Sequence, residues 1–566
     1  MAVKLSIYID ASIAGNPIVK DYFIPLYPKT VMELFNGEVK ASVSDIPECA
    51  DIVLCNASSD VVFENVLPIV VDEKISKIYE NINSFPLPKV ANNENECVQL
   101  AMNLMFAVLS RLGIGNFHSR IFISYKRRDT EALALNLFKR LSSESLGFEV
   151  FLDTRKLDVG ANFMDDIRLS ITESDVFLFL DSPSYLKGVY TKKELYSAMS
   201  SCTGIIRIST QKEAYEAEAA NIVAAYETVQ ILNSNDISEA EFRGLIRVIC
   251  KQRISFLKNK IERINSFCGL HRRERETLWS FKVAGLRICP IWGVPSSQRI
   301  ERIEKKLADT GRENTVFSIL YDHWNIPNSY NKHIQWVVSE KSNIGIKTLQ
   351  TLYKRSNNDS ANAPIVFLSA SLPSDECHDY DFVKVYTIIV TLVEEIINNK
   401  GKLVFGGHPT ITPIIANMMN VQNISSGGKE TPCIRLYQSA FFESDKRPIE
   451  NLDFPEKNIT IVSKGGNIED SLRTMREKML REEGKLTLGL FIGGKVKNNN
   501  GILSCGVWDE CELFHANHPN AICVAFANTG TDIDRLRKCD KGSEEIEIIV
   551  PKSIKEFVEL LSKNAK

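Results

Sequence analysis

The chain has 566 residues, which is enough for about three or four domains. Hydrophobic residues make up 44% and charged residues 25%, as in ordinary globular proteins. The net charge of −3 excludes a global field that would recruit nucleic acid or an acidic membrane, and no apolar run approaches the roughly 20 residues that cross a bilayer.

The first residues indicate a strand and lack the layout of a signal peptide, so we expect a cytoplasmic protein. The 13 cysteines are scattered, and no two are separated by only two residues. This spacing argues against a structural zinc site and against a secreted disulfide scaffold. We therefore expect no metal and no bound cofactor. From the net charge and the short apolar runs, we also expect no membrane partner and no direct nucleic-acid partner.

Residues 1–115 predict a small α/β domain. Strand-like runs occur at 5–9, 52–55 and 68–71, and a helix is expected at 100–112. No motif assigns this domain a role. It could be a sensor or a packing module for its neighbour, since a fold alone does not specify function.

The most informative segment is IFISYKRRD at 121–129. Its apolar start indicates a short strand that ends at Ser124 and Tyr125, and a basic loop follows. Leucines then recur every four residues from position 133, which predicts a helix that Thr130 or the aspartate before it can cap. Open α/β sheets bind small molecules at this strand edge.

Three further segments follow in order. Residues 148–153 predict a strand that ends at Asp153, and the polar loop Thr154–Gly160 comes next. The almost wholly apolar run at 175–183 is typical of a strand buried in a parallel sheet. Tyr185 and a helix that contains Glu194 come after it.

With these pieces in this order, residues 119–205 resemble a TIR domain, which implies a flavodoxin-like α/β fold. TIR domains either only associate or cleave NAD+. In the enzymes, a glutamate on the helix after the fourth strand carries the reaction, and the matching residue here is Glu194. The resemblance implies that NAD+ is a substrate bound by the following residues: Phe122, Ser124, Tyr125, Arg127, Arg128, Asp153, Tyr185 and Tyr190.

Each predicted residue type suits a part of NAD+. Cleavage of the nicotinamide–ribose bond generates an oxocarbenium-like centre, which a carboxylate stabilises. Nicotinamide leaves as a neutral molecule, so no general acid is needed. Aromatic rings can stack on or wall in the ligand, and an arginine can meet the pyrophosphate. The alternative is that Glu194 is a surface helix residue paired with a neighbouring lysine.

Residues 206–353 predict a mainly helical connecting region. The alanine-rich segment 214–225 precedes a charged helix at 242–263, whose apolar residues recur at helical spacing. Several tryptophans indicate a core of its own, and His323 is interpreted as a structural histidine. The polar, breaker-rich segment at 354–363 predicts a linker.

A second α/β domain is predicted at 364–566. Its first strand ends in Ser369 and Ser371. Two later strands each end in a glycine pair, at 406–407 and at 493–494, and a helix with Glu510 is expected to begin at Gly506. Glycines at such turns let backbone N–H groups approach phosphate, and helix N-termini favour negative charge.

This succession resembles the SLOG superfamily of Rossmann-like nucleotide-binding domains. The resemblance implies a ligand site that contains the following residues: Ser369, Ser371, Gly406, Gly407, His408, Thr410, Thr412, Gly493, Gly494, Glu510 and Thr529. One departure is the insertion Lys495–Cys505, which separates the second glycine pair from the helix that follows. In the nucleoside hydrolases of this superfamily these parts are nearly contiguous, so the insertion favours binding over hydrolysis.

The two resemblances together imply an NAD+ glycohydrolase controlled by a nucleotide or an ADP-ribose-derived signal molecule. The pairing resembles Thoeris-type effectors, which implies bacterial antiviral defence by NAD depletion. The alternatives are a non-catalytic TIR scaffold with a nucleotide sensor and a nucleoside monophosphate hydrolase that uses Glu510. Whether the product is linear or cyclic, and which nucleotide activates, stays open.

We also expect a homo-oligomer that assembles through the TIR or SLOG domains. In TIR domains the loop after the second strand commonly contacts a neighbouring copy, and here this loop is Thr154–Gly160. Its Arg155, Lys156 and Asp158 suit an exposed segment. Activity would then rise with assembly.

Overall fold

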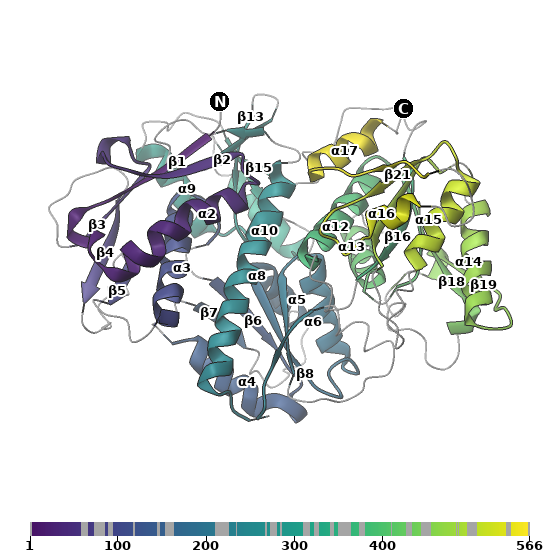
Figure 1. Ribbon diagram of the computed structural model, residues 1–566, viewed down its shortest axis with the longest axis horizontal. Helices are drawn as coiled ribbons and strands as arrows, with labels where there is room; N and C mark the ends of the chain where they lie inside the picture. The colour runs from purple at the N-terminus through teal and green to yellow at the C-terminus, as the bar shows by residue number, and fades with distance from the viewer. Residues whose placement is uncertain are drawn as a thin grey trace. The chain divides into compact units, whose positions relative to one another are not determined.

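The computed structural model of the chain contains four β-sheets flanked by helices among the described residues (Figure 1). The chain is therefore a multidomain α/β protein, as predicted. No helix in these parts of the chain is both long and apolar enough to cross a membrane. The structure describes residues 3–57, 66–72, 85–88, 94–116, 119–143, 148–152, 163–209, 226–233, 235–265, 269–271, 280–283, 286–309, 317–321, 326, 328–339, 344–348, 364–372, 380–408, 410–425, 433–442, 454, 456–482, 484, 486–494, 506–538 and 545–563.

The chain divides into two compact units by its internal contacts. The first comprises Met1–Leu180 and Val229–Leu349, and the second comprises Asp181–Thr228 and Gln350–Lys566. Helix α6, which carries Glu194, therefore belongs to the same compact unit as the C-terminal domain.

The N-terminal domain is a parallel five-stranded sheet with the strand order β2-β1-β3-β4-β5. The predicted strands and helix are all present, and α3 ends where Gly113 adopts a positive φ of 80°. Ile114 then donates its N–H to the carbonyl of Leu109, which closes the helix end. The main elements are β1 Val3–Ile9, α2 Ile24–Leu34, β2 Val39–Ser44, β3 Ile52–Asn56, β4 Val66–Asp72, β5 Phe85–Pro88 and α3 Glu94–Arg111.

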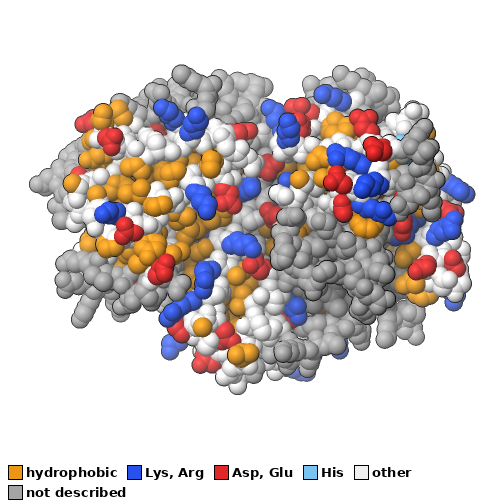
Figure 2. Space-filling view, viewed as in Figure 1, with side chains coloured by type: hydrophobic (Ala, Val, Ile, Leu, Met, Phe, Trp, Pro, Cys, Tyr) orange, Lys and Arg blue, Asp and Glu red, His pale blue; other side chains and the backbone are white. Residues whose placement is uncertain are grey.

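Hydrophobic side chains cover much of the N-terminal domain face that carries α2 (Figure 2). Met32 on α2 is 56% exposed, and Ile46 in the loop after β2 is 54% exposed. Exposed apolar patches often mark contact surfaces.

The second sheet has the strand order β10-β9-β8-β6-β7. Strand β6 pairs in parallel with β7 and β8, and this register places Phe122 opposite both Phe151 and Phe177. The elements are β6 Ser119–Ser124, α4 Arg127–Leu141, β7 Phe148–Leu152, α5 Phe163–Glu173, β8 Val176–Asp181, α6 Val189–Ser200, β9 Gly204–Ser209, β10 Glu227–Gln230 and α8 Glu239–Asn265.

Helix α4 begins earlier than predicted. Its first residue is Arg127, preceded by Lys126 with no side-chain cap, and its backbone leaves helical geometry at Thr130. The N–H groups of Asp129 and Thr130 both donate to the carbonyl of Lys126, so these residues close a first turn. Both residues therefore lie inside the helix and not at its N-cap position, and Thr130 marks a kink in it.

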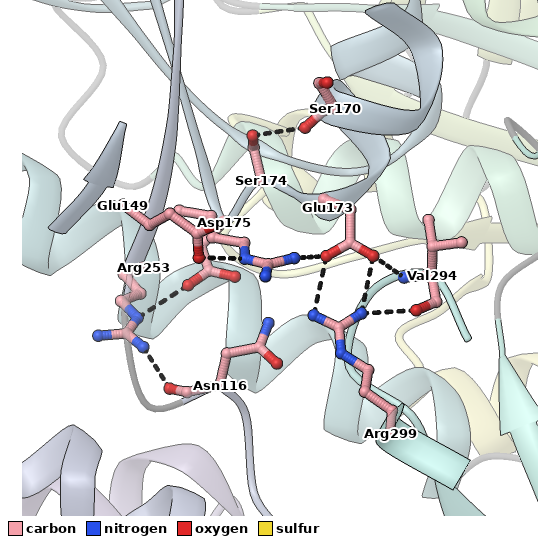
Figure 3. Close-up of polar contacts among 10 residues, drawn as sticks. Asn116, Glu149, Ser170, Glu173, Ser174, Asp175, Arg253, Val294 and Arg299 are labelled. Atoms are coloured by element: carbon pink, nitrogen blue, oxygen red, sulfur yellow. Dashed lines mark hydrogen bonds and ion pairs between the residues drawn. The ribbon is translucent and has the colours of Figure 1, made fainter. Parts of the chain in front are cut away.

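Buried and half-buried ion pairs hold the first unit together at the start of β6 and β8 (Figure 3). Glu173, the last residue of α5, pairs with Arg120 and accepts hydrogen bonds from Arg299 of α9, at 2.7 and 2.8 Å, and from the Val294 N–H. Burial lowers the pKa of Arg299. This cluster fixes the β6 and β8 starts to the domain that follows α8.

Arg253 of α8 is the most enclosed member of these pairs. Its guanidinium is 3.0 Å from Asp175, donates to the Asn116 carbonyl at 2.6 Å and lies 3.7 Å from the centre of the Phe106 ring. Burial raises the pKa of Asp175 and lowers that of Arg253, while their mutual attraction opposes both shifts. One side chain thus connects the N-terminal domain, the linker after it, β8 and α8.

The region after α8 differs from the mainly helical prediction. It contains a third sheet with the order β11-β12-β13-β14-β15, antiparallel at its first pairs and parallel at the others. Each strand has only three to five residues, too few for a clear alternating pattern. Trp292 is buried and Trp336 exposed, whereas His323 lies outside the described residues. The elements are β11 Gly269–His271, β12 Ser280–Val283, β13 Leu286–Pro290, α9 Ser297–Asp309, β14 Phe317–Tyr321, α10 Asn328–Ser339 and β15 Ile344–Thr348.

The C-terminal sheet is parallel and has the strand order β19-β18-β17-β16-β20-β21-β22. The order reverses between β16 and β20, which is where doubly wound sheets bind ligands. Helices α12, α13 and α17 form one contacting group, and α14, α15 and α16 form another. The elements are β16 Ile365–Ser371, α12 Phe382–Asn398, β17 Lys402–Gly406, α13 Thr412–Ser425, β18 Cys433–Ser439, β19 Ile459–Val462, α14 Ile468–Glu482, β20 Leu488–Gly493, α15 Gly506–Asn517, β21 Ile522–Ala525, α16 Ile533–Arg537, β22 Ile548–Ile549 and α17 Ile554–Lys563.

Removing Arg253 should destabilise the first unit strongly. Arg253→Met leaves Asp175 buried without its cation, so we expect a loss of about 3–5 kcal/mol in unfolding free energy. Arg473→Met, which breaks an exposed pair with Glu477, should cost about 0.5 kcal/mol or less. Urea denaturation compares the two, and Asp175→Asn combined with Arg253→Met should recover part of the loss. Equal losses of unfolding free energy in Arg253→Met and Arg473→Met would contradict the stabilising role of the buried Arg253–Asp175 pair.

Candidate functional site

Glu194 lies on α6 in a buried environment. The residue is 8% exposed, and every residue from Glu194 to Ser200 is buried. At the start of the helix, the Thr191 hydroxyl donates to the carbonyls of Tyr185 and, at 3.1 Å, Gly188. Glu194 is therefore not a solvated surface residue. The Thr191 hydroxyl also connects the first turn of α6 to the loop that precedes it.

The two tyrosines predicted to wall the substrate pocket differ in their surroundings. Tyr185 is fully buried, while Tyr190 in the first turn of α6 is 50% exposed. Of these two tyrosines, Tyr190 is therefore the one that presents its ring to solvent.

The residues at the end of β6 form a gradient of exposure. Ser124 is 1% exposed and Tyr125 is 8% exposed, whereas Arg127 is half-buried and Arg128 is exposed. Phe122 is 1% exposed, and its ring stacks between those of Phe151 and Phe177, with centroids 5.1 and 5.4 Å away. Its ring belongs to the core, so this packing does not support the prediction that Phe122 stacks on substrate. Asp153 and the loop Thr154–Gly160 lie outside the described residues.

Asp181 is a buried carboxylate that the sequence analysis did not single out. It ends β8, and its Oδ2 lies 2.6 Å from both Nε and an Nη atom of Arg207 on β9. Its Oδ1 is buried and has no hydrogen-bond partner among the described residues. The signal that could have found it was an aspartate directly after the apolar run that forms β8.

In the C-terminal domain, the predicted serines and the second glycine pair meet where the strand order reverses. The pairing of β16 with β20 places Ser371 beside Gly493. The Ser369 hydroxyl is buried and has no hydrogen-bond partner in the part of the chain that the structure describes. A buried hydroxyl without a partner costs stability, so this edge offers an unused polar group to a ligand.

The loop after β17 does not present the free N–H groups that a phosphate cradle needs. Gly407 donates its N–H to the Tyr437 carbonyl at 3.2 Å, and His408 donates to the Thr412 hydroxyl at 3.0 Å. The N–H groups of the next residues donate back to His408, that of Thr410 to the ring and those of Ile411 and Thr412 to the carbonyl. The predicted contact of the loop amides with phosphate is therefore not supported, because these donors already have partners.

His408 is the centre of this loop. Its Nδ1 lies 2.8 Å from the Thr410 hydroxyl, which in turn accepts a hydrogen bond from the Leu372 N–H after β16 at 3.2 Å. Thr410 and Thr412 are both fully buried. Loss of solvation lowers the pKa of His408 to about 4. The neutral ring thus connects the ends of β16 and β17.

The ends of β20 and β21 have the backbone geometry of a binding loop. Gly493 and Gly494 have φ values of 74° and 94°, and after β21 Asn528 and Gly530 also lie in the left-handed region. Gly493 donates its N–H to the Thr531 hydroxyl at 2.7 Å. Thr529, which is fully buried, donates its hydroxyl to the Phe526 carbonyl. Successive residues of this kind form concave turns that suit anions.

Glu510 already has a cationic partner. Its Oε1 lies 2.9 Å from Arg476 Nε of α14, and both side chains are 14% exposed. A Cβ at Gly506 would lie 2.3 Å from the same guanidinium, so the glycine makes room for the arginine. The pair connects α14 to α15, which weighs against Glu510 as a free ribose ligand or hydrolytic base. The insertion Lys495–Cys505 lies outside the described residues.

The neutral state of His408 predicts a pH effect on the loop. Its pKa is lower in the folded protein than the ordinary value of 6.5, so the stability it contributes is complete above pH 6.5 and is lost as the pH falls towards 4. NMR of protein labelled at the histidine rings should show one ring that titrates near pH 4 and whose signal is missing in His408→Gln. A His408 signal that titrates near 6.5 would contradict the assignment.

Comparison with known proteins identifies two of the domains. Residues 121–246 match the TIR domain family, and residues 377–553 match the SLOG cluster3 family. Among solved structures, the TIR domain of the Toll-related receptor TRR-2 from Hydra magnipapillata matches at 24% identity, covering 23% of this chain and 96% of that one, with a TM-score of 0.19. No curated protein matches the chain. The chain therefore contains a TIR domain followed by a C-terminal SLOG domain.

Proposed function

We propose that the protein is an NAD+ glycohydrolase whose TIR domain is controlled by a ligand of the SLOG domain. The observation that carries this proposal is the buried carboxylate of Glu194 on α6, the helix after β8 in the TIR fold. In a site with little water, a carboxylate stabilises a developing cation far more than it does in bulk solvent.

The proposed reaction uses few groups. The nicotinamide–ribose bond breaks, its electron pair leaves with neutral nicotinamide, and Glu194 stabilises the oxocarbenium-like ribose. Water then adds to that carbon, which gives ADP-ribose and a proton. Tyr190 is the exposed ring proposed to contact NAD+, and Arg127 or Arg128 is proposed to meet the pyrophosphate.

The regulatory ligand is proposed to be a nucleotide or an ADP-ribose derivative bound where the SLOG sheet reverses. The supporting residues are Ser369, whose hydroxyl has no hydrogen-bond partner among the described residues, the neighbouring Ser371, and the left-handed Gly493 and Gly494. The sequence pattern predicted phosphate contacts in the loop after β17, whereas we now propose them in the loop after β20. The presence of both domains in one chain supports a role in antiviral defence by NAD depletion, with assembly of several copies as part of activation.

Glu194→Gln tests the catalytic proposal. The change keeps the size of the side chain and removes its charge, so NAD+ cleavage should fall by about 10²–10³-fold while the protein stays folded. Product analysis by mass spectrometry measures the rate, and circular dichroism confirms folding. Glu131→Gln, on the exposed surface of α4, is the matched control and should retain activity. Full activity in Glu194→Gln would refute the role.

Gly494→Ala tests the ligand site. Its φ of 94° is strained for alanine, and the added Cβ would enter the proposed phosphate loop, so ligand affinity should fall about tenfold or more. Gly484→Ala is the matched control, because it has a φ of 76° with open space around the Cβ and lies before β20. Calorimetry of the full chain with ADP-ribose and purine nucleotides provides the readout. The proposal fails if no compound binds or if both variants lose affinity equally.

A further inference from the structure

Helix α6 packs against α13 of the SLOG domain within the second compact unit. Residues Glu194–Ser200 of α6 are buried, and Ile415 and Met418 on α13 are buried as well. Between the two helices, Asn417 donates its Nδ2 hydrogen to the Ser200 hydroxyl at 2.6 Å. The helix that carries the proposed catalytic carboxylate is thus fixed by a SLOG helix.

The Ser200 hydroxyl is well placed to hold this contact. It accepts from Asn417 and can donate to the Tyr196 carbonyl at 3.0 Å or the Ser197 carbonyl at 3.2 Å. The Ser200 hydroxyl and the two carbonyls lie in the buried part of α6, whereas Asn417 on α13 is half-buried. Because a buried polar group that loses its partner is costly, the two helices have one preferred register.

The path from this hydrogen bond to Glu194 on one side, and to the loop after β17 on the other, is short. Ser200 is six residues from Glu194 along α6, which corresponds to about 9 Å at 1.5 Å per residue. Asn417 is five residues from Thr412, the first residue of α13, or about 7.5 Å. The Thr412 hydroxyl accepts the His408 N–H, so the start of α13 is part of the loop beside the switch point of the SLOG sheet.

A second connection runs through α12. After β21, Thr529 forms a bridge with Tyr380, and Asn528 accepts the Asp381 N–H at 3.0 Å. Asp381 caps α12 through the N–H groups of the next residues. One turn later, the hydroxyl of Tyr386 lies 2.7 Å from that of Tyr226, next to β10, and both rings are fully buried.

We propose that Asn417 is a positioning residue, through which the SLOG loop that ends in Thr412 sets the orientation of α6 and hence of the Glu194 carboxylate. The proposal rests on the proposed NAD+ cleavage for its catalytic readout, but the mechanical coupling stands on the packing alone. A ligand bound at the ends of β16 and β20 reaches the loop after β17 through the Leu372 N–H, which donates to the Thr410 hydroxyl. A shift of this loop moves the start of α13, and the Asn417–Ser200 bond transfers the shift to α6. Rigid packed helices pass on such shifts because they have few alternative arrangements.

A double-mutant cycle on the full chain tests the coupling without a ligand. Thr412→Val removes the hydroxyl that accepts the His408 N–H and so perturbs the loop after β17. Asn417→Ala removes the hydrogen bond to Ser200 on α6. We expect each to lower kcat for NAD+ about fivefold or more with KM changed less than twofold, and the double variant to lose no more than either alone. Ser200→Ala should reproduce Asn417→Ala, which guards against a folding defect in one variant.

The second readout is amide exchange of α6, followed by mass spectrometry. Exchange should accelerate in Thr412→Val, and this response should disappear when Asn417→Ala is already present. Asn458→Ala is the control, since Asn458 Nδ2 donates to the Ile434 carbonyl beside the edge strand β19, and this variant should change neither readout.

The outcomes separate the two proposals. Additive losses of kcat, or equal exchange responses in both backgrounds, overturn the role of Asn417. An equal effect of Asn458→Ala overturns it as well. If the wild-type chain does not cleave NAD+ but α6 exchange responds as expected, the proposed activity fails while the coupling stands.

Discussion

The first unit depends on one buried guanidinium. Arg253 contacts the Phe106 ring, the Asn116 carbonyl and the Asp175 carboxylate, and these belong to three successive parts of the chain. A buried charge is tolerated only with such complete pairing, because its desolvation costs several kcal/mol. The arrangement fixes the amino end of β8, which follows Asp175, whereas Asp181 lies at the carboxyl end of the same strand. The ion pairs thus hold the amino ends of the strands, and the NAD+ cleavage is proposed beyond their carboxyl ends.

The polar groups at the carboxyl ends of the parallel strands show how a sheet edge is divided between structure and function. At the end of β17, the loop residues satisfy one another through His408, Thr410 and Thr412. At the ends of β16 and β20, the Ser369 hydroxyl has no partner within the described parts of the chain, and two glycines occupy left-handed conformations. Glycine-rich turns of similar sequence therefore differ in structure: the Gly407 N–H donates to a backbone carbonyl, whereas Gly493 and Gly494 have a positive φ and the Gly493 N–H donates to a hydroxyl.

The assignment of α6 to the second compact unit changes how regulation can be understood. A helix that carries a proposed catalytic group is normally supported by its own domain. Here α6 is also enclosed by α13, with Asn417 bonded to Ser200, and Tyr226 near β10 is bonded to Tyr386 of α12. Coupling between two sites needs differential contacts in two states, and these contacts lie between the two sites. The proposed coupling relies on these two hydrogen bonds and the packing of α6 on α13.

The sequence by itself determined the elements with strong local patterns. The apolar runs of β6, β8, β16 and β20 and the leucine stripe of α4 were predictable because burial between layers requires long apolar stretches or a helical stripe. The position of Glu194 followed from the resemblance to TIR domains, and those of the glycine pairs from their place at strand ends. Short strands such as β11 and β12 were not predictable, because three or four residues carry too little periodicity and their pairing is decided by distant segments.

Only the tertiary structure decided which of the predicted side chains are available to a ligand. Phe122 was predicted to stack on substrate, but the parallel register places its ring between two phenylalanines from neighbouring strands. Glu510 was predicted near a ribose, but α14 brings Arg476 to it from 34 residues away. Asn417 became a candidate only through its partner Ser200, which is 217 residues away in the chain. Partners of this kind depend on how layers pack, which local residue patterns do not encode.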